Sequence, residues 1–431
     1  MSDLNAENPF FHLVNDQQIL TVDRFELECG DTLEQVPLAY KTWGKLNAEG
    51  TNCMVVCHAL SGSADVADWW GALIGEGRAL DPTRFFIVCA NTLGSPYGTA
   101  SPVTIQPDTG KTWGPEFPLT TVKDDAAIQR ILLDYLNVKQ VAVVIGGSMG
   151  GMLAQEYLFF GQDFVKCAVL LATSAYHSAW GISWGEAQRQ SIYCDPKFMD
   201  GFYPRNDPPE AGLGAARMSA LLTYRTRNSF DQKFGRELPN PAKHKGSDSV
   251  DGGQRLSPSE ENLAIHNHGN PRRSSNDAPQ TFRMKPAQTY FTAQSYLRYQ
   301  AQKFTKRFDA NCYVAITRKM DTHDVSRGRT SSVGEALSLI KQPVLIIGIV
   351  SDALFTFTEQ EEIHKSINGS VLRKIDSPDG HDAFLLEFGL INTYIQDFLC
   401  EHLPEFMAGV TKKPIGSAGN SVFGESEVTT W

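Results

Sequence analysis

The chain has 431 residues, of which 42% are hydrophobic and 20% are charged, and its formal net charge is −10 at pH 7. This composition is ordinary for a globular protein, and the negative charge argues against nucleic acid as a partner. The sequence contains neither an apolar run long enough to span a membrane nor the features of a signal peptide in its first residues, MSDLNAENPF. We therefore expect a soluble, cytoplasmic protein without a membrane segment.

The eight cysteines are scattered along the chain and include no CxxC pair. This pattern indicates reduced, mostly buried thiols rather than a disulfide framework. Three histidines at 244, 266 and 268 lie in a polar stretch that offers no scaffold to fix ligand geometry. We expect no metal site and no bound cofactor.

Five short apolar runs predict buried strands, because continuous rather than alternating hydrophobicity is typical of strands covered on both faces. A helical repeat from Ile128 to Leu136 follows a capping pattern formed by Thr121 and Asp124, and it predicts a crossover helix between the second and third strands. Strands that alternate with helices predict an α/β protein with a mostly parallel central sheet and helices on both faces. The runs span 52–58, 84–90, 139–147, 164–172 and 343–350.

The strand pattern stops in the middle of the chain, where amphipathic helices without buried strands predict a helical lid inserted into the core. The predicted organisation is a core formed by 1–178 and 336–431, with the lid at 179–335. Within the lid, 235–283 is rich in Pro, Gly, Ser, Asn and charge, and we expect a disordered loop there.

The segment VAVVIGGSMGGMLAQEY predicts a nucleophile elbow. A buried strand leads into GGSMG, which matches G-x-S-x-G, and a helix follows. In such a turn the serine, Ser148, has a strained backbone and presents its hydroxyl at the helix N-terminus, while Gly146 and Gly150 give clearance. The alternative is a glycine-rich turn that packs tightly or binds phosphate.

A serine hydroxyl becomes a nucleophile only when a base takes its proton, and a third group must orient that base. Asp352 follows the strand PVLIIGIVS, and His381 lies later, in DSPDGHDAF, which is the chain order expected after a nucleophile elbow. Alternative roles are a helix N-cap for Asp352 and a surface turn for His381. His58 and His177 also follow strands and are competing bases.

The oxyanion of a tetrahedral intermediate is stabilised by two backbone N–H groups. The residue after the nucleophile, Met149, provides the first. The second is expected from Leu60, because the loop HALSGS at 58–63 leaves its strand at the same edge of the sheet.

Several long motifs together resemble the homoserine O-acetyltransferases, most closely their fungal-type branch, which are acyltransferases with an α/β-hydrolase fold. The resemblance covers about 12–232 and 286–405, and its motifs include HALSGSADVADWWG, NTLGSPYGTASP, GGSMGGMLAQEY, AGLGAARMSALLTYRTRNSF and DGHDAF. It implies transfer of acetyl from acetyl-CoA to homoserine by a ping-pong mechanism in methionine biosynthesis. Ser148, Asp352 and His381 would then form the catalytic triad.

The resemblance also implies two substrate-binding residues. Arg217 would hold the substrate carboxylate, and Asp382 would hold its amino group. A homodimer is compatible with the resemblance. Alternatives are a serine O-acetyltransferase or an O-succinyltransferase of the same fold, a simple esterase, and a non-enzymatic binding protein with a vestigial triad.

Overall fold

The computed structural model describes residues 5, 8–238, 257–266, 291–413 and 415. Their strands form one eight-stranded sheet in the order β1-β2-β4-β3-β5-β6-β7-β8. All neighbours from β4 to β8 pair in parallel, whereas β1 pairs antiparallel with β2, and β2 with β4. The strands are β1 (Gln18–Glu26), β2 (Thr32–Trp43), β3 (Cys53–Cys57), β4 (Phe86–Ala90), β5 (Val141–Gly147), β6 (Val165–Leu171), β7 (Val344–Ile349) and β8 (Val371–Ile375).

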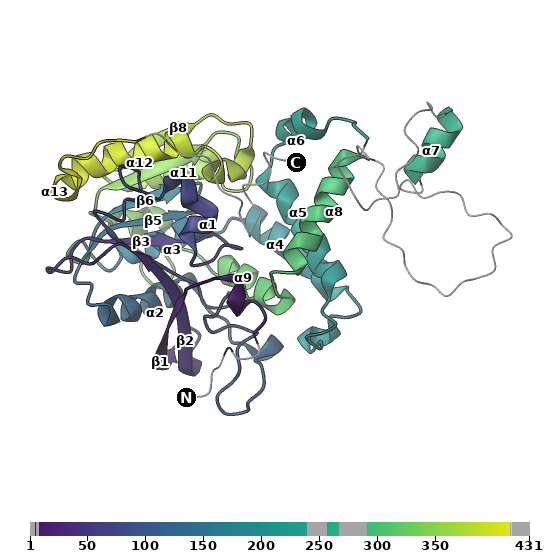
Figure 1. Ribbon diagram of the computed structural model, residues 1–431, viewed down its shortest axis with the longest axis horizontal. Coiled ribbons are helices and arrows are strands. Elements are labelled where there is room, and N and C mark those ends of the chain that lie inside the picture. Colours follow the sequence, from purple (N-terminus) through teal and green to yellow (C-terminus); the bar gives the residue numbers. More distant parts are fainter. Residues whose placement is uncertain (1–4, 6–7, 239–256, 267–290, 414, 416–431) are drawn as a thin grey trace.

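Helices cover both faces of the sheet, and alternate strand residues supply the two halves of the core (Figure 1). Val55 of β3 packs into the half formed with α2 (Val122–Tyr135), α3 (Met149–Leu158), α10 (Val333–Ser338) and α11 (Phe357–Ser366). The neighbouring Val56 packs into the opposite half, formed with α1 (Val66–Trp70), α12 (Phe388–His402) and α13 (Pro404–Met407). Burial on both faces explains the continuous apolar runs of these strands.

The predicted fold class is confirmed, and each of the five apolar runs contains a strand, from β3 to β7. The crossover helix is present as α2, and its N-terminus carries the capping box of Thr121 and Asp124. The two antiparallel strands β1 and β2 were not predicted. β1 lies at the sheet edge, where only Val22 and Phe25 of its nine residues are buried, so it lacks a continuous apolar run.

A group of helices lies between β6 and β7 in the chain and beside the sheet in space (Figure 1). Within it α4 packs on α5 and α5 packs on α8. We propose that this group is the predicted lid at 179–335. The helices are α4 (Ala179–Tyr193), α5 (Glu210–Tyr224), α6 (Arg227–Phe234), α7 (Pro258–His266), α8 (Thr292–Thr305) and α9 (Ala310–Asp321). Of the stretch expected to be a loop, 235–238 and 257–266 are described, and α7 is helical; the remainder lies outside the described residues.

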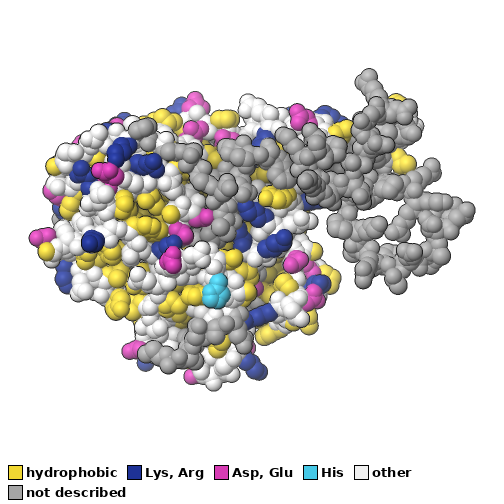
Figure 2. Space-filling model, viewed as in Figure 1, with side chains coloured by type: hydrophobic (Ala, Val, Ile, Leu, Met, Phe, Trp, Pro, Cys, Tyr) yellow, Lys and Arg dark blue, Asp and Glu magenta, His cyan; other side chains and the backbone are white. Residues whose placement is uncertain are grey.

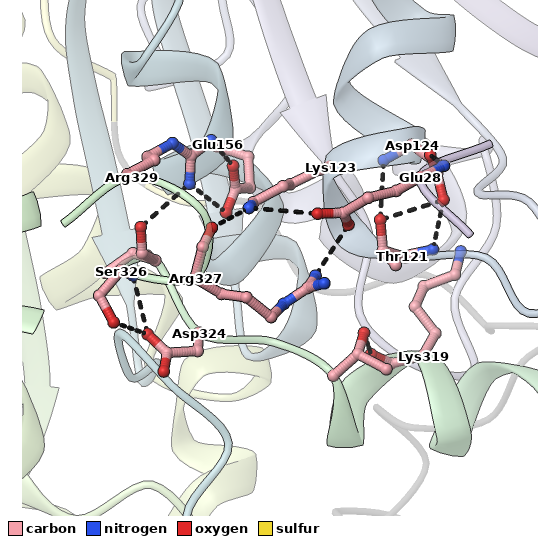
Figure 3. A network of polar contacts seen from close by, with 12 residues as sticks. Glu28, Thr121, Lys123, Asp124, Glu156, Lys319, Asp324, Ser326, Arg327 and Arg329 are labelled. Atoms are coloured by element: carbon pink, nitrogen blue, oxygen red, sulfur yellow. Dashed lines mark hydrogen bonds and ion pairs between the residues drawn. The ribbon is translucent and has the colours of Figure 1, made fainter. Parts of the chain in front are cut away.

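A polar network fixes the chain where it returns from this group of helices to the core (Figure 3). Arg329 binds both carboxylate oxygens of Glu156, a buried residue of α3. Arg327 donates to Glu28 at 2.8 Å, and Lys123 of α2 pairs with the same carboxylate at 3.3 Å. The returning segment is thereby tied to the helix that follows Ser148.

Over the face shown in Figure 2, basic and acidic side chains are interspersed with apolar ones. Within the described ranges, no helix has both the length and the apolar character that crossing a membrane demands.

Candidate active site

Ser148 lies in the sharp turn between β5 and α3. Its backbone has φ 58° and ψ −128°, a region that a non-glycine residue adopts only where the surrounding structure enforces it. The turn is tightly packed, because a Cβ atom on Gly146 would lie 2.0 Å from the carbonyl oxygen of Gly150, and one on Gly150 would lie 2.1 Å from that of Cys57. The glycines of GGSMG therefore provide the clearance that an elbow requires.

Three side chains from distant parts of the sequence form a continuous hydrogen-bonded chain at this turn. His381 Nε2 lies 2.9 Å from Ser148 Oγ, and His381 Nδ1 lies 2.7 Å from Asp352 Oδ2. The other carboxylate oxygen of Asp352 accepts the backbone N–H groups of Leu354 and Phe355, at 2.8 and 3.0 Å. These donors hold the carboxylate so that it can orient the imidazole, which is the geometry of a serine, histidine and acid triad.

The imidazole is enclosed by aromatic rings. Those of Phe355 and Phe384 lie 5.3 and 5.2 Å from it, and that of Tyr224 in α5 lies 5.9 Å away. His381 is 3% exposed and Ser148 is 6% exposed, so bulk water has little access to either group. A low-dielectric setting of this kind strengthens the electrostatic interactions within the site.

The two predicted oxyanion donors are the residue that directly follows Ser148 and a residue that lines the same pocket. Met149 is the first residue of α3, so its N–H has no acceptor within the helix. Leu60 lines the same pocket as Ser148 and follows β3, as does Ser61, whose carbonyl accepts a hydrogen bond of 3.0 Å from Arg307. The loop at 58–63 is therefore held by a side chain from the segment between α8 and α9.

The competing histidines occupy other positions. The His58 ring is bonded to the backbone, since its Nε2 accepts from Thr92 N at 3.1 Å and its Nδ1 lies 2.8 Å from the Ala59 carbonyl oxygen. Burial lowers the pKa of His58 to about 4, so the ring is neutral and braces the loop. His177 Nδ1 lies 3.3 Å from Asp321 Oδ1 instead. Of these three histidines, His381 is the one whose ring nitrogen lies within hydrogen-bonding distance of Ser148 Oγ in the described structure.

Arg217 and Asp382 line one pocket together with Ser148 and His381. Arg217 is on α5 and is 3% exposed, and its guanidinium carbon lies 4.8 Å from the centre of the Phe304 ring. Asp382 directly follows His381 in the 3-10 helix η5 (Gly380–Leu385). A guanidinium and a carboxylate thus line the pocket of Ser148, and such groups can hold the two charged ends of an amino acid.

Sequence reasoning missed three polar side chains of this pocket, Tyr224, Tyr296 and Gln300. Tyr224 and Tyr296 were assigned only to amphipathic helices. Burial raises the pKa of Tyr296 to about 12, so its hydroxyl keeps its proton. All three come from α5 and α8, and no local motif identifies them, because helical spacing shows which face is buried but not what that face contacts.

No group of three or more His, Cys, Asp or Glu side chains in the described part of the chain is arranged to hold a metal ion. Nucleophilic chemistry by Ser148 does not require one.

The mostly parallel sheet, the strained turn at Ser148 and the hydrogen-bonded Ser148, His381 and Asp352 define an α/β hydrolase fold. The family model of that fold matches residues 52–388. The chain is also 52% identical to the homoserine O-acetyltransferase of Ascobolus immersus, over 99% of this chain and 96% of the relative. The chain therefore belongs to the homoserine O-acetyltransferase family, as the sequence motifs predicted.

Solved structures share the fold at low sequence identity. The homoserine O-acetyltransferase from Bacillus anthracis superposes with a TM-score of 0.72 at 20% identity, covering 93% of this chain and 99% of the other. A mutant of esterase E22 has the same TM-score at 23% identity, covering 89% and 99%. Because an esterase matches as well as an acetyltransferase, the fold by itself does not distinguish water from an amino acid as acceptor.

Proposed function

We propose that this chain is a homoserine O-acetyltransferase that moves an acetyl group from acetyl-CoA to the hydroxyl of homoserine, a step of methionine biosynthesis. The observation that carries the proposal is the arrangement of one pocket. It contains Ser148 hydrogen-bonded to His381, and a buried arginine, Arg217, and an aspartate, Asp382, line it as well. Relatives named homoserine O-acetyltransferase, at about half sequence identity over almost the whole chain, support the same activity.

In the first half-reaction His381 Nε2 takes the proton of Ser148 as Oγ attacks the thioester carbonyl carbon of acetyl-CoA. The negative charge that develops on the carbonyl oxygen is stabilised by the N–H groups of Leu60 and Met149. The carbon–sulfur bond then breaks, and the protonated imidazole gives its proton to the CoA sulfur. Asp352 stabilises that imidazolium and keeps its tautomer. The products are CoA thiol and an acetyl ester on Ser148.

In the second half-reaction the hydroxyl of homoserine gives its proton to His381 and attacks the acetyl carbon. The ester bond to Ser148 breaks, and the serine recovers a proton from the imidazolium. O-acetylhomoserine leaves, and the enzyme returns to its starting state. The kinetics are therefore ping-pong, because CoA leaves before the acceptor reacts.

Water competes with homoserine for the acetyl ester. Homoserine must therefore react faster than water, because the pocket holds its hydroxyl next to the acetyl carbon. Arg217 can grip the substrate carboxylate with two parallel hydrogen bonds, and Asp382 can accept the ammonium group. Holding a hydroxyl against the reacting carbon is worth an effective molarity of roughly 10⁵ to 10⁸ M. The helices α5 and α8 also limit the approach of water.

A single assay tests donor and acceptor together. Purified protein is incubated with acetyl-CoA or succinyl-CoA, crossed against homoserine, serine and no acceptor, and thiol release is followed. We expect sustained turnover only with acetyl-CoA and homoserine. Equal turnover without an acceptor would indicate an esterase, and faster turnover with serine or succinyl-CoA would indicate the corresponding alternative transferase.

We also propose that the protein works in the cytosol. All eight cysteines are free, and five of them are buried. Burial raises the pKa of Cys53 and Cys57, so these thiols stay protonated and unreactive. Free thiols of this kind suit a reducing compartment.

A further inference from the structure

A β-turn at 59–62 sets the direction of the predicted oxyanion donor Leu60. Gly62 N donates to the carbonyl of Ala59 at 3.0 Å and closes this turn. The Ala59 carbonyl and the Leu60 N–H belong to one planar, trans peptide unit, in which they point in opposite directions. Any group that holds the Ala59 carbonyl therefore also fixes the direction of the Leu60 N–H.

The Ala59 carbonyl has a second donor, the buried ring of His58. His58 Nε2 accepts from Thr92 N at 3.1 Å, so the proton of this neutral ring is on Nδ1. That nitrogen lies 2.8 Å from the Ala59 carbonyl oxygen. A ring nitrogen and a backbone N–H thus fix the peptide unit that carries the Leu60 N–H.

The next peptide unit of the turn is held by Arg307. Its Nη1 atom donates to the carbonyl of Ser61 and to the hydroxyl of Tyr97, at 3.0 Å in each case. The Ser61 carbonyl shares its peptide unit with the Gly62 N–H, the group that closes the turn. A continuous hydrogen-bonded chain therefore runs from the guanidinium through two peptide units to the N–H of Leu60.

The guanidinium is itself fixed by its surroundings. Arg307 is 4% exposed, and its guanidinium carbon lies 5.0 Å from the centre of the Phe304 ring. Phe304 stacks on Phe308 at 4.9 Å, and Asp309 caps α9 by accepting from Cys312 N at 3.0 Å. Although Arg307 lies between α8 and α9 in the chain, its side chain acts on the loop that follows β3.

The same chain of hydrogen bonds transmits the charge of the guanidinium. Hydrogen bonds in series polarise one another, and a bond donated by a cation is stronger than one between neutral groups. The two peptide units are arranged in the same sense, since each accepts at its carbonyl and donates at its N–H. A guanidinium stays protonated in proteins, so this polarisation of the Leu60 N–H is permanent.

We propose that Arg307 is a positioning residue for the oxyanion hole: through the turn at 59–62 it holds the Leu60 N–H toward the carbonyl oxygen under attack and strengthens it as a donor. The inference rests on the proposed function, in which Leu60 and Met149 stabilise the tetrahedral intermediates of both half-reactions. Because both intermediates use these donors, Arg307 acts on both half-reactions and functions with the sheet region.

The test removes this donor and its charge in the full chain. Arg307→Met keeps an apolar stem against Phe304 but cannot bind the Ser61 carbonyl. We expect acetylation of Ser148 and its deacetylation by homoserine to slow by a common factor of about 10 to 100, because loss of a whole oxyanion donor costs about 10² to 10³ in kcat. The KM for homoserine should not change. Arg307→Lys, which keeps the charge and a donor, should recover most of the loss.

Arg189→Met is the matched control. Arg189 is also 4% exposed, and the change removes a buried ion pair with Asp321 at 2.7 Å, but Arg189 lies on α4. This variant should lose stability and keep the acetylation rate. An Arg307→Met enzyme that acetylates Ser148 as fast as Arg189→Met, or one that is slow only in the homoserine step, would overturn the inference.

A spectroscopic readout reports the oxyanion hole directly. The infrared stretch of an isotope-labelled acetyl carbonyl on Ser148 falls in frequency as the hydrogen bonds to its oxygen become stronger. It should rise in Arg307→Met and stay at the wild-type value in Arg307→Lys and Arg189→Met. Arg307→Gln, which is uncharged but polar, should show the same rise and replaces Arg307→Met if that variant does not fold. An unchanged frequency in the uncharged variant would overturn the inference.

Two acetyl donors separate this inference from the proposed function. The burst of nitrophenol from p-nitrophenyl acetate reports acetylation of Ser148 without CoA or homoserine, and the burst of thiol from acetyl-CoA reports it with the proposed donor. A wild-type enzyme that reacts with the ester but not with acetyl-CoA would contradict the proposed function, and the ester would still test Arg307. A wild-type enzyme that gives neither burst would refute both.

Discussion

The pocket is built by two regions that differ in how they are constructed. The sheet supplies Ser148, Asp352 and His381 from loops at strand ends, and their relative positions are fixed by backbone geometry and short hydrogen bonds. The helices between β6 and β7 supply side chains such as Arg217 and Tyr296 from their buried faces. We interpret the first region as the place of the reaction and the second as the place where the acceptor is chosen. Variants in the sheet region should therefore slow both half-reactions, whereas variants in the helical region should slow the transfer to the acceptor and leave acetylation of Ser148 intact.

The largest effect is expected in the sheet region, from Asp352→Asn. The change leaves shape and volume intact but removes the charge that holds the imidazole and stabilises its protonated form. We expect kcat to fall by about 10⁴-fold. Both half-reactions should slow, because both use His381 as base. Stopped-flow measurement of the acetyl-CoA burst and of steady-state turnover checks this, with Asp376→Asn as an exposed control.

The next effect concerns the helical region. Arg217→Met keeps an apolar stem against Phe304 but removes the guanidinium that we assign to the substrate carboxylate. The kcat/KM for homoserine should fall about 100-fold or more, since a buried charged contact is lost. The burst of thiol release from acetyl-CoA should persist.

Arg227→Met is the control for this change, because Arg227 is 91% exposed and follows α5 in the chain. If Arg217→Met lost the burst of thiol release to the same degree as it lost turnover, Arg217 would be needed for acetylation of Ser148 as well. The helical region would then not act only on the acceptor.

A stability measurement tests the ion pair of Arg329 and Glu156, which connects the two regions. Arg329→Met leaves Glu156 buried without its partner (Figure 3), and removal of one member of a buried ion pair costs about 3 kcal/mol or more. Urea denaturation should show this loss in the free energy of unfolding. Arg24→Met, which breaks an exposed pair with Glu34 at 3.8 Å, should change it by about 0.5 kcal/mol or less. Equal effects would mean that the network does not anchor the helical region.

A further effect, spread over several pH units, concerns His58 and the loop at 58–63. Burial holds the folded-state pKa of His58 at about 4, below its ordinary value of 6.5. As pH falls below 6.5 the unfolded chain takes up this proton first, so stability present above pH 6.5 is lost progressively until about pH 4. The loss is of order 3 kcal/mol, at about 1.4 kcal/mol for each pH unit between the two values.

His58→Gln should flatten this part of the stability profile, measured by denaturation at a series of pH values. His12→Gln serves as the control, because His12 is exposed. An unchanged slope in His58→Gln would show that the buried ring does not take part in the pH response.

These two regions also differ in how far the sequence predicts them. Buried strands carry continuous apolar runs and the elbow has a fixed glycine pattern, so Ser148 and the strands around it follow from local rules. Asp352 and His381 follow from chain order and loop position. By contrast, Arg217 on a helix resembles any buried or paired charge, and only the family resemblance identified it.

What remained hidden depends on contacts between distant segments. Tyr296 and Gln300 line the pocket of Ser148 because α8 packs on α5, and no spacing in the sequence encodes that packing. The edge strand β1 was missed because most of its residues are exposed, and β2 was missed because its buried run is limited to 36–40 and is interrupted by Pro37. The homodimer and the limits of the lid stay predictions.

The most direct test of the account is to find the acetyl group on Ser148. Protein mixed with labelled acetyl-CoA and no acceptor is quenched within milliseconds, and the peptide that contains Ser148 is analysed by mass spectrometry. We predict an acetyl label on that serine that disappears when homoserine is added and yields O-acetylhomoserine. Turnover of homoserine without any label on Ser148, or a label that homoserine does not remove, would contradict the division of labour proposed for the two regions.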